Sequence, residues 1–151
     1  MTAPRVSPLE AHLGYWLRYV SNHVSHAFAL KVAERGVSVA EWVVMSELYG
    51  AGTVPSALAD KLGMTRGAIS KIVDRLEAKA LVSRTASTTD RRSQMLALTK
   101  SGQALVPKLA ELADRNDEEF FGHLDPKQRA RLEAAMKDIV RRSGLRTVPL
   151  E

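Results

Sequence analysis

The stretch that most constrains this chain covers residues 55–99, where two short amphipathic segments meet at a glycine. Leu58 and Leu62 lie one helical turn apart in the first segment, and apolar residues recur at intervals of three and four in the second. Gly63 separates the segments at a point where left-handed backbone favours glycine. Thr65 follows with an oxygen that suits a helix N-cap. This pattern predicts two helices packed at a steep angle, as in a helix-turn-helix motif.

The second helix of this pair carries polar and basic residues on the face that its apolar stripe leaves free. In a helix that enters the major groove of DNA, N-terminal side chains reach base edges and more distal cations lie against phosphates. The predicted DNA-binding residues of this helix are Thr65, Arg66, Gly67, Ser70 and Lys71, with Arg75 at a phosphate. A solvated helix face with incidental basic residues is the alternative. It is the weaker explanation because the turn, the cap and the basic face coincide.

A basic hairpin is predicted directly after this helix. Residues 81–86 and 93–98 alternate as strands do, and a polar tip at 87–92 joins them. Arg84 is expected to hold a phosphate, while Arg91 and Arg92 at the tip suit the negative potential of a narrow groove. Asp90 is placed to hold Arg92 in a forked ion pair. Taken alone, the tip is better explained as an exposed loop salt bridge of little energetic value.

The order of these elements resembles the multiple antibiotic resistance regulator (MarR) family of bacterial transcription factors. The resemblance rests on AEWVVMSEL, on LADKLGMTRGAISKIVDRLEAKALV and on TDRRSQMLALTKSG. The last segment holds the wing signature Asp90, Arg92, Ser93, Leu98, Thr99 and Gly102. Roughly residues 9–142 are covered, and Ala80 departs from the pattern because many members have glycine there. The resemblance implies a homodimer that presents two recognition helices to successive major grooves about 34 Å apart.

Amphipathic helices are also predicted at both ends of the chain. Residues 9–35 repeat apolar side chains every three or four positions, ending at Gly36. A helix of about 40 Å is too long to pack only on a small winged unit. Thr99 and the Asp125-Pro126 pair are expected to begin two further helices. These terminal helices can bury their apolar stripes against a second copy in a two-fold dimer, or against each other in a monomer.

The predicted fold is therefore mainly α with a small β-hairpin wing, in a single domain over residues 1–151. A winged helix-turn-helix lobe at residues 37–99 is flanked by dimerisation helices at residues 9–35 and 103–146. Within the lobe, Ser38 is expected to cap a helix with Glu41 as its capping-box partner. Residues 50–55 are expected to be a connector.

A ligand pocket is implied by the resemblance alone. In that family, small amphipathic ligands, often aromatic acids, bind where the first two helices meet the winged domain. His12, Trp16, Tyr19 and Trp42 are expected to contribute to such a pocket, and packing in the dimer interface explains these residues equally well. No metal or other cofactor is expected, because His23 and His26 have a suitable spacing but no evident third ligand.

Composition narrows the classes of function. The 151 residues contain no cysteine, which removes disulfides and thiolate metal sites. No apolar run approaches the ~18 residues of a membrane span, and the absence of a signal-peptide pattern predicts a cytoplasmic protein with no membrane partner. A net charge of +5 suits a polyanion. No grouping of residues at catalytic spacing indicates an enzyme.

The predicted function is that of a homodimeric, sequence-specific transcriptional regulator on double-stranded DNA with a pseudopalindromic operator. It is expected to repress, and to be released by a small aromatic or phenolic effector that prefers the spacing of recognition helices unsuited to DNA. The alternative is a winged-helix interaction module that binds protein, or DNA without sequence preference.

Overall fold

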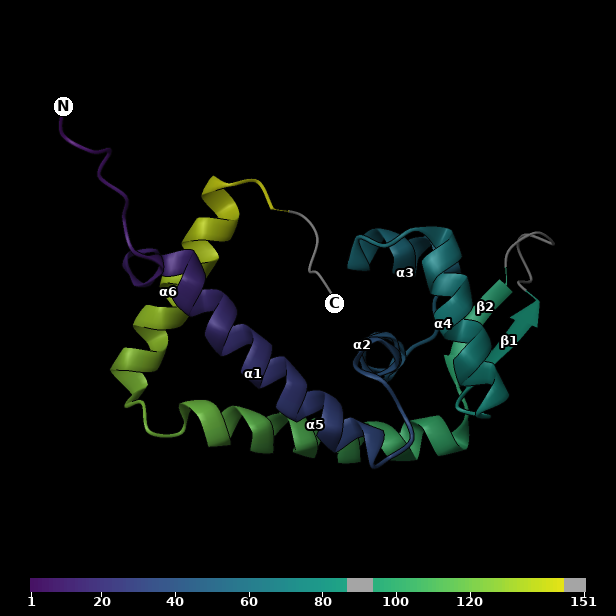
Figure 1. The fold of residues 1–151 in the computed structure, drawn as a ribbon. Helices are drawn as coiled ribbons and strands as arrows, with labels where there is room; N and C mark the ends of the chain where they lie inside the picture. Colours follow the sequence, from purple (N-terminus) through teal and green to yellow (C-terminus); the bar gives the residue numbers. More distant parts are fainter. Residues whose placement is uncertain (87–93, 146–151) are drawn as a thin grey trace.

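The structure is a computed structural model that describes residues 1–86 and 94–145 (Figure 1). Its elements are a 3-10 turn η1 (Leu9–Ala11), the helices α1 (Leu13–Ala33), α2 (Val39–Leu48), α3 (Pro55–Leu62) and α4 (Arg66–Ala78), the strands β1 (Val82–Ala86) and β2 (Gln94–Leu98), and the helices α5 (Lys100–Phe121) and α6 (Pro126–Arg142). Helix α5 runs along one side of the molecule; α2, α3, α4 and the strands gather at its start, and α6 rises from its far end (Figure 1). The mainly α fold with a hairpin wing is thus confirmed.

The core lies where α2, α4, the two strands and the first half of α5 meet. The predicted apolar stripe of α4 is buried there through Ile69, Ile72, Val73 and Leu76. Leu109 from α5 is also fully buried. Burying a side chain of this size stabilises the fold by about 1.5–3 kcal/mol, so packing in this core fixes where the polar face of α4 points.

The first helix begins later than the sequence pattern predicts. The chain forms η1 first, His12 is extended at φ −99° and ψ 127°, and α1 starts only at Leu13. The indole Nε1 of Trp16 donates to the carbonyl oxygen of Glu10 at 2.9 Å. That bond gives a carbonyl outside the helix a partner, which favours the break over a continuous helix.

The connector before α3 joins the sheet, which the sequence analysis missed. Thr53 pairs with Leu96 of β2 through two backbone hydrogen bonds, of 3.0 and 2.7 Å. A Cβ on Gly52 would lie 2.5 Å from the Leu96 carbonyl oxygen, so the close approach requires glycine there. The hairpin itself pairs antiparallel, with Val82 opposite Leu98.

Helix α4 ends in a left-handed residue that is not glycine. Ala80 has φ +58°. Its N–H donates to the Glu77 carbonyl oxygen, and the Leu81 N–H donates to that of Leu76, both at 2.9 Å. These two bonds form a Schellman motif, whose left-handed position usually holds glycine. The departure from the family pattern at Ala80 therefore changes the residue but not the way the helix ends.

Ala80→Gly is expected to raise the free energy of unfolding by about 0.5–1 kcal/mol. A Cβ in left-handed backbone costs about 1–2 kcal/mol, and glycine removes this cost. Part of the gain is offset because glycine loses more conformational entropy on folding than alanine does. Urea denaturation of the two proteins measures the difference. Gly36→Ala is the matched control, because Gly36 ends α1 at φ +78° and should lose stability. A lower urea midpoint for Ala80→Gly would contradict the prediction.

Candidate nucleic-acid interface

The turn between α3 and α4 confirms the predicted local signals. Gly63 has φ +65°, and the following N–H of Met64 donates to the Ala59 carbonyl oxygen at 2.9 Å. The Thr65 hydroxyl oxygen accepts the Ala68 N–H at 3.1 Å and so caps α4. The first turn of α4 is therefore held at the surface, directly after a fixed turn.

The predicted polar face of α4 is exposed to solvent. Arg66, Gly67, Ser70, Lys71 and Arg75 all lie on the surface, away from the buried stripe. Within residues 1–86 and 94–145, Arg66 and Lys71 form no ion pair. Their charges are therefore not balanced by the described part of the chain, which is the condition for attracting an external anion.

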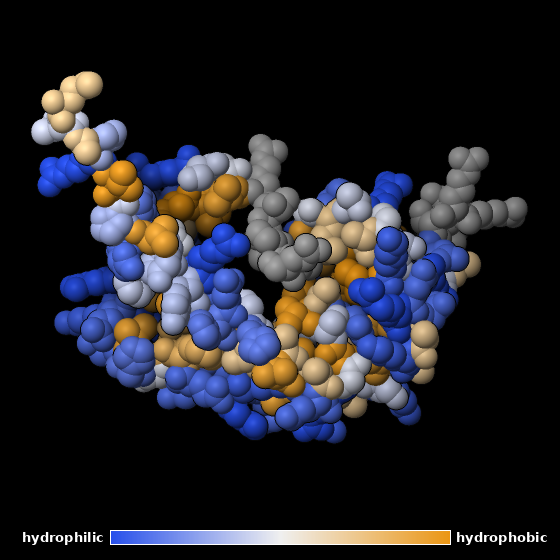
Figure 2. All heavy atoms as spheres, viewed as in Figure 1, coloured by the Kyte–Doolittle hydropathy of each residue, from blue (hydrophilic) through white to orange (hydrophobic). Residues whose placement is uncertain are grey.

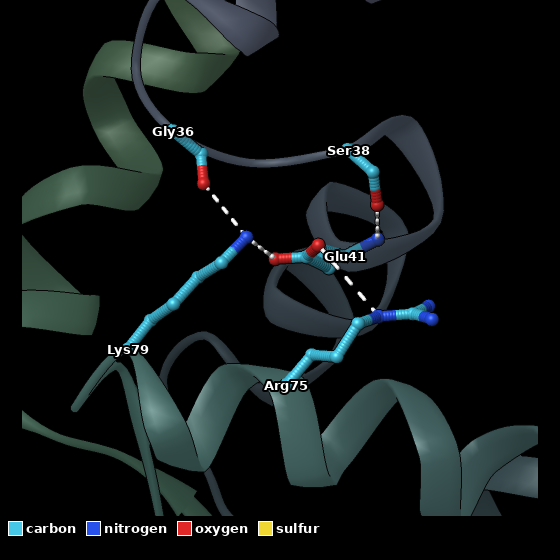
Figure 3. A network of polar contacts seen from close by, with 5 residues as sticks. All are labelled: Gly36, Ser38, Glu41, Arg75 and Lys79. Carbon is cyan, nitrogen blue, oxygen red and sulfur yellow. Dashed lines mark hydrogen bonds and ion pairs between the residues drawn. The ribbon is translucent and has the colours of Figure 1, made fainter.

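Toward its C-terminal end, α4 is held by the buried carboxylate of Glu41 (Figure 3). The ammonium of Lys79 donates to Glu41 Oε2 at 2.7 Å and to the Gly36 carbonyl oxygen at 2.8 Å. Arg75 Nε lies 3.9 Å from Glu41 Oε1. Only 4% of the Glu41 side chain is exposed. The Arg75 side chain is 55% exposed, so the same residue still reaches solvent.

Of the predicted capping box at the start of α2, the structure contains the Ser38 cap but not the bond from the Glu41 side chain. Ser38 does cap the helix, since its hydroxyl oxygen accepts the Glu41 N–H at 3.1 Å. The Glu41 carboxylate instead pairs with the cations of α4. A buried carboxylate without a cation nearby is strongly destabilised. Lys79 and Arg75 supply that positive charge to Glu41, which the backbone N–H of Ser38 would not.

Arg84, predicted to hold a phosphate, is paired within the chain. Its guanidinium forms an ion pair with Asp74 of α4, and its Nε lies 3.5 Å from Glu77 Oε2. The side chain is 27% exposed. The phosphate contact stays a prediction, but the charge of Arg84 is already balanced by two carboxylates.

The root of the wing is fixed on the end of α4, whereas its tip is not described. The Thr99 hydroxyl donates to the Ala80 carbonyl oxygen at 2.7 Å and accepts the Gly102 N–H at 3.1 Å, so Thr99 caps α5 as predicted. Thr99 and Gly102, noted first as parts of a wing signature, therefore have structural roles. Asp90, Arg91 and Arg92 lie outside the described residues, and their ion pair and groove contacts stay predictions.

The four residues predicted for a ligand pocket do not line one cavity. Trp16 and Tyr19 line a groove between the start of α1 and α6. Trp42 packs against Phe28 with ring centroids 6.4 Å apart, about 18 Å along α1 from Trp16. His12 precedes α1, with Nδ1 3.3 Å from the Leu9 carbonyl oxygen. Helical spacing alone did not reveal that α2 packs on the C-terminal half of α1, whereas Trp16 and Tyr19 lie in its N-terminal half.

A smaller cavity of about 210 Å³ lies beside Phe28, where α1, α2 and α5 meet. Its lining includes Val39 of α2 together with Asn116 and Phe121 of α5. The sequence pattern does not reveal these residues, because the contact between α1 and α5 joins segments more than eighty positions apart.

The terminal helices leave apolar stripes uncovered. The exposed side chains, from 42% to 80% exposed, are Leu13, Trp16, Leu17 and Val20 on α1, and Leu132, Met136, Ile139 and Val140 on α6. A groove of about 780 Å³ lies between these stripes. Figure 2 shows separate hydrophobic patches at this end of the molecule, and further hydrophobic patches at the winged end. No residue of α6 is buried in the single chain.

The histidines on α1 are not arranged as a metal centre. Tyr19 and His23 have ring centroids 5.0 Å apart. Among residues 1–86 and 94–145, no three histidine, aspartate or glutamate side chains are grouped so that they could hold a metal ion. In the same residues, none of the helices has the length and apolar character needed to cross a bilayer.

The chain matches a family model and, among other proteins, one curated relative and two solved structures. Residues 35–93 match the model of the MarR family. A putative transcriptional regulatory protein for the hcr operon of Thauera aromatica is 33% identical over 93 residues, which is 62% of this chain and 56% of that protein. The chain thus aligns with little more than half of that relative's length.

The two structural matches share the fold at low sequence identity. A mutant of MarR from E. coli, crystallised with operator DNA, has a TM-score of 0.77 and 23% identity, over 85% of this chain and 93% of that one. Bordetella bronchiseptica BpsR, whose DNA binding is regulated by 6-hydroxynicotinic acid, has a TM-score of 0.77 and 20% identity, over 89% and 97%. The relatives named here are regulators rather than enzymes.

Proposed function

Because the winged helix-turn-helix part of this chain belongs to the MarR family, we propose that the protein is a homodimeric, sequence-specific transcriptional regulator that represses from a pseudopalindromic operator. The observation that carries the proposal is the exposed first half of α4. A cap at Thr65 holds it at the surface, and the described residues leave Arg66 and Lys71 without ion pairs. The Thauera aromatica relative, a putative regulatory protein, supports the same function.

Each part of the surface has a distinct role in the proposal. Arg66, Gly67, Ser70 and Lys71 approach base edges in the major groove, where a bidentate contact discriminates by about 1–3 kcal/mol. Arg75 holds a phosphate from the side of α4 that also faces Glu41. Arg91 and Arg92 of the wing tip, with Asp90, contact the neighbouring minor groove.

A second copy of the chain covers the apolar stripes of α1 and α6 in this proposal. The stripes are continuous along each helix, since Leu132, Met136, Ile139 and Val140 repeat at helical spacing. Contiguous exposed apolar surface of this kind marks an interaction site. A two-fold axis through these helices pairs each stripe with its own copy.

A small aromatic or phenolic effector completes the proposal. BpsR, which shares the fold, is regulated by 6-hydroxynicotinic acid. The cavity beside Phe28 is bounded by α2, which contacts α4 through Glu41. A ligand that binds the DNA-incompetent arrangement more tightly lowers operator affinity by the ratio of its two affinities.

Lys71→Ala is expected to weaken operator binding about 10-fold, within the range for the loss of one base contact. Operator duplexes are first selected from genomic fragments with the wild-type protein, and fluorescence anisotropy then compares them with scrambled duplexes across a salt series. Lys108→Ala on α5, an exposed lysine that is not among the proposed DNA-binding residues, is the control and should bind as wild type does. Equal wild-type affinity for selected and scrambled duplexes would overturn the proposed function in favour of a non-specific interaction module.

A further inference from the structure

We propose that Arg84 is a positioning residue of the DNA-binding face, and that it acts by offsetting part of the negative charge of Asp74 and Glu77 rather than by holding a phosphate. The inference rests on the proposed function. It reassigns a residue that the sequence pattern placed at the DNA backbone.

The location of Asp74 creates the need for such a residue. Asp74 follows Gly67 by seven positions and Lys71 by three, so it shares the face of α4 opposite the buried stripe. Its side chain is 64% exposed. When this face approaches DNA, the carboxylate comes among phosphates, and like charges repel more strongly as water is displaced.

Glu77 adds a second negative charge one turn further along α4. Its side chain is 49% exposed. With both carboxylates uncompensated, the second half of α4 would oppose the attraction that Arg66 and Lys71 supply in the first half. A cation fixed between the two acids reduces this opposition without a contact to DNA.

Arg84 is held in the place that this role requires. Strand β1 leaves the end of α4 through the Schellman turn at Ala80, and Arg84 pairs with Leu96 in the hairpin. Its guanidinium reaches back to both acids. Its Nε is buried and donates no hydrogen bond within the described part of the chain. To hold a phosphate, the guanidinium would have to leave both carboxylates.

The test compares wild type with Arg84→Met, with Asp74→Asn/Glu77→Gln, and with the triple variant, by anisotropy on selected and scrambled duplexes. Arg84→Met is expected to bind about 10-fold more weakly, because it leaves two exposed carboxylates without a paired cation. The triple variant is expected to return to within about 3-fold of wild type, because no net charge is left to cancel. Arg142→Met, which breaks the pair of Arg142 with Asp138 on α6, controls for the loss of an arginine.

Restoration in the triple variant separates the proposal from its alternatives. A phosphate ligand, or a purely structural bridge between wing and helix, would leave the triple variant as weak as Arg84→Met, and that result overturns the proposal. So would unchanged binding by Arg84→Met. If wild type binds both duplexes equally, the proposed function fails. The role of Arg84 is still tested in that case, because the affinities of Arg84→Met and the triple variant can be compared on the scrambled duplex. Thermal unfolding followed by circular dichroism checks that every variant is folded.

Discussion

Gly102→Ala is expected to lower the free energy of unfolding by about 2–3 kcal/mol, the upper part of the range for overpacking a close contact. Gly102 lies in the first turn of α5, against the root of the wing. A Cβ there would lie 2.2 Å from the Leu81 carbonyl oxygen and 3.1 Å from Leu98 Cδ2. The Leu81 oxygen also accepts the Thr99 N–H at 3.0 Å. Because both sides of the contact are backbone, relief requires α5 to move away from the wing.

Urea denaturation of Gly102→Ala and wild type measures this cost. Gly14→Ala is the matched control, because nothing lies within 4 Å of a Cβ at Gly14. Gly14 is in α1, where alanine is the better helix former, so the control should be as stable as wild type or slightly more so. A Gly102→Ala protein as stable as wild type would show that the helix and wing separate without cost.

Ile139→Glu is expected to weaken self-association at least 100-fold, or about 3 kcal/mol, and to abolish operator binding at nanomolar protein. Ile139 is 50% exposed in the single chain and belongs to the apolar stripe of α6. In the proposed dimer the new carboxylate would be buried without a cation, which costs several kcal/mol. Sedimentation equilibrium over a concentration series gives the dissociation constant of the dimer.

Ala134→Glu controls for the added charge, because Ala134 is exposed on the opposite face of the same helix. It should dimerise as wild type does. A wild-type protein that sediments as a monomer would contradict the dimer directly. An Ile139→Glu dimer as tight as wild type would mean that the copies meet through another surface, and that the stripes of α1 and α6 have a different partner.

Features that depend on neighbouring residues were predicted well from the sequence. The cap at Thr65, the left-handed Gly63 and the cap at Thr99 involve hydrogen bonds over three to five positions. The residue types at such positions are restricted by backbone geometry itself. The fold class followed from the same local signals, since helix periodicity and turn residues set the order of elements.

Features that depend on distant partners were not predicted. Glu41 was assigned to a capping box because its real partner, Lys79, is 38 positions away. Trp42 was grouped with Trp16 because the sequence does not show which end of α1 meets α2. The pairing of Arg84 with Asp74 and Glu77 could have been predicted from the sequence. Strand β1 follows α4 after a short turn and packs against it, so an arginine on β1 lies within reach of the acids in the last turns of α4.

Two adjacent residues of α2 contact two different helices. Glu41 binds the last turns of α4 through Lys79, and Trp42 packs on Phe28 of α1. Successive side chains on a helix point about 100° apart, so α2 cannot roll about its axis without breaking one of these contacts. The two contacts therefore connect Phe28 of α1 to the end of α4 through a single helix. A substitution at Phe28, although it lies far from the proposed DNA surface, is expected to affect the packing that holds the end of α4.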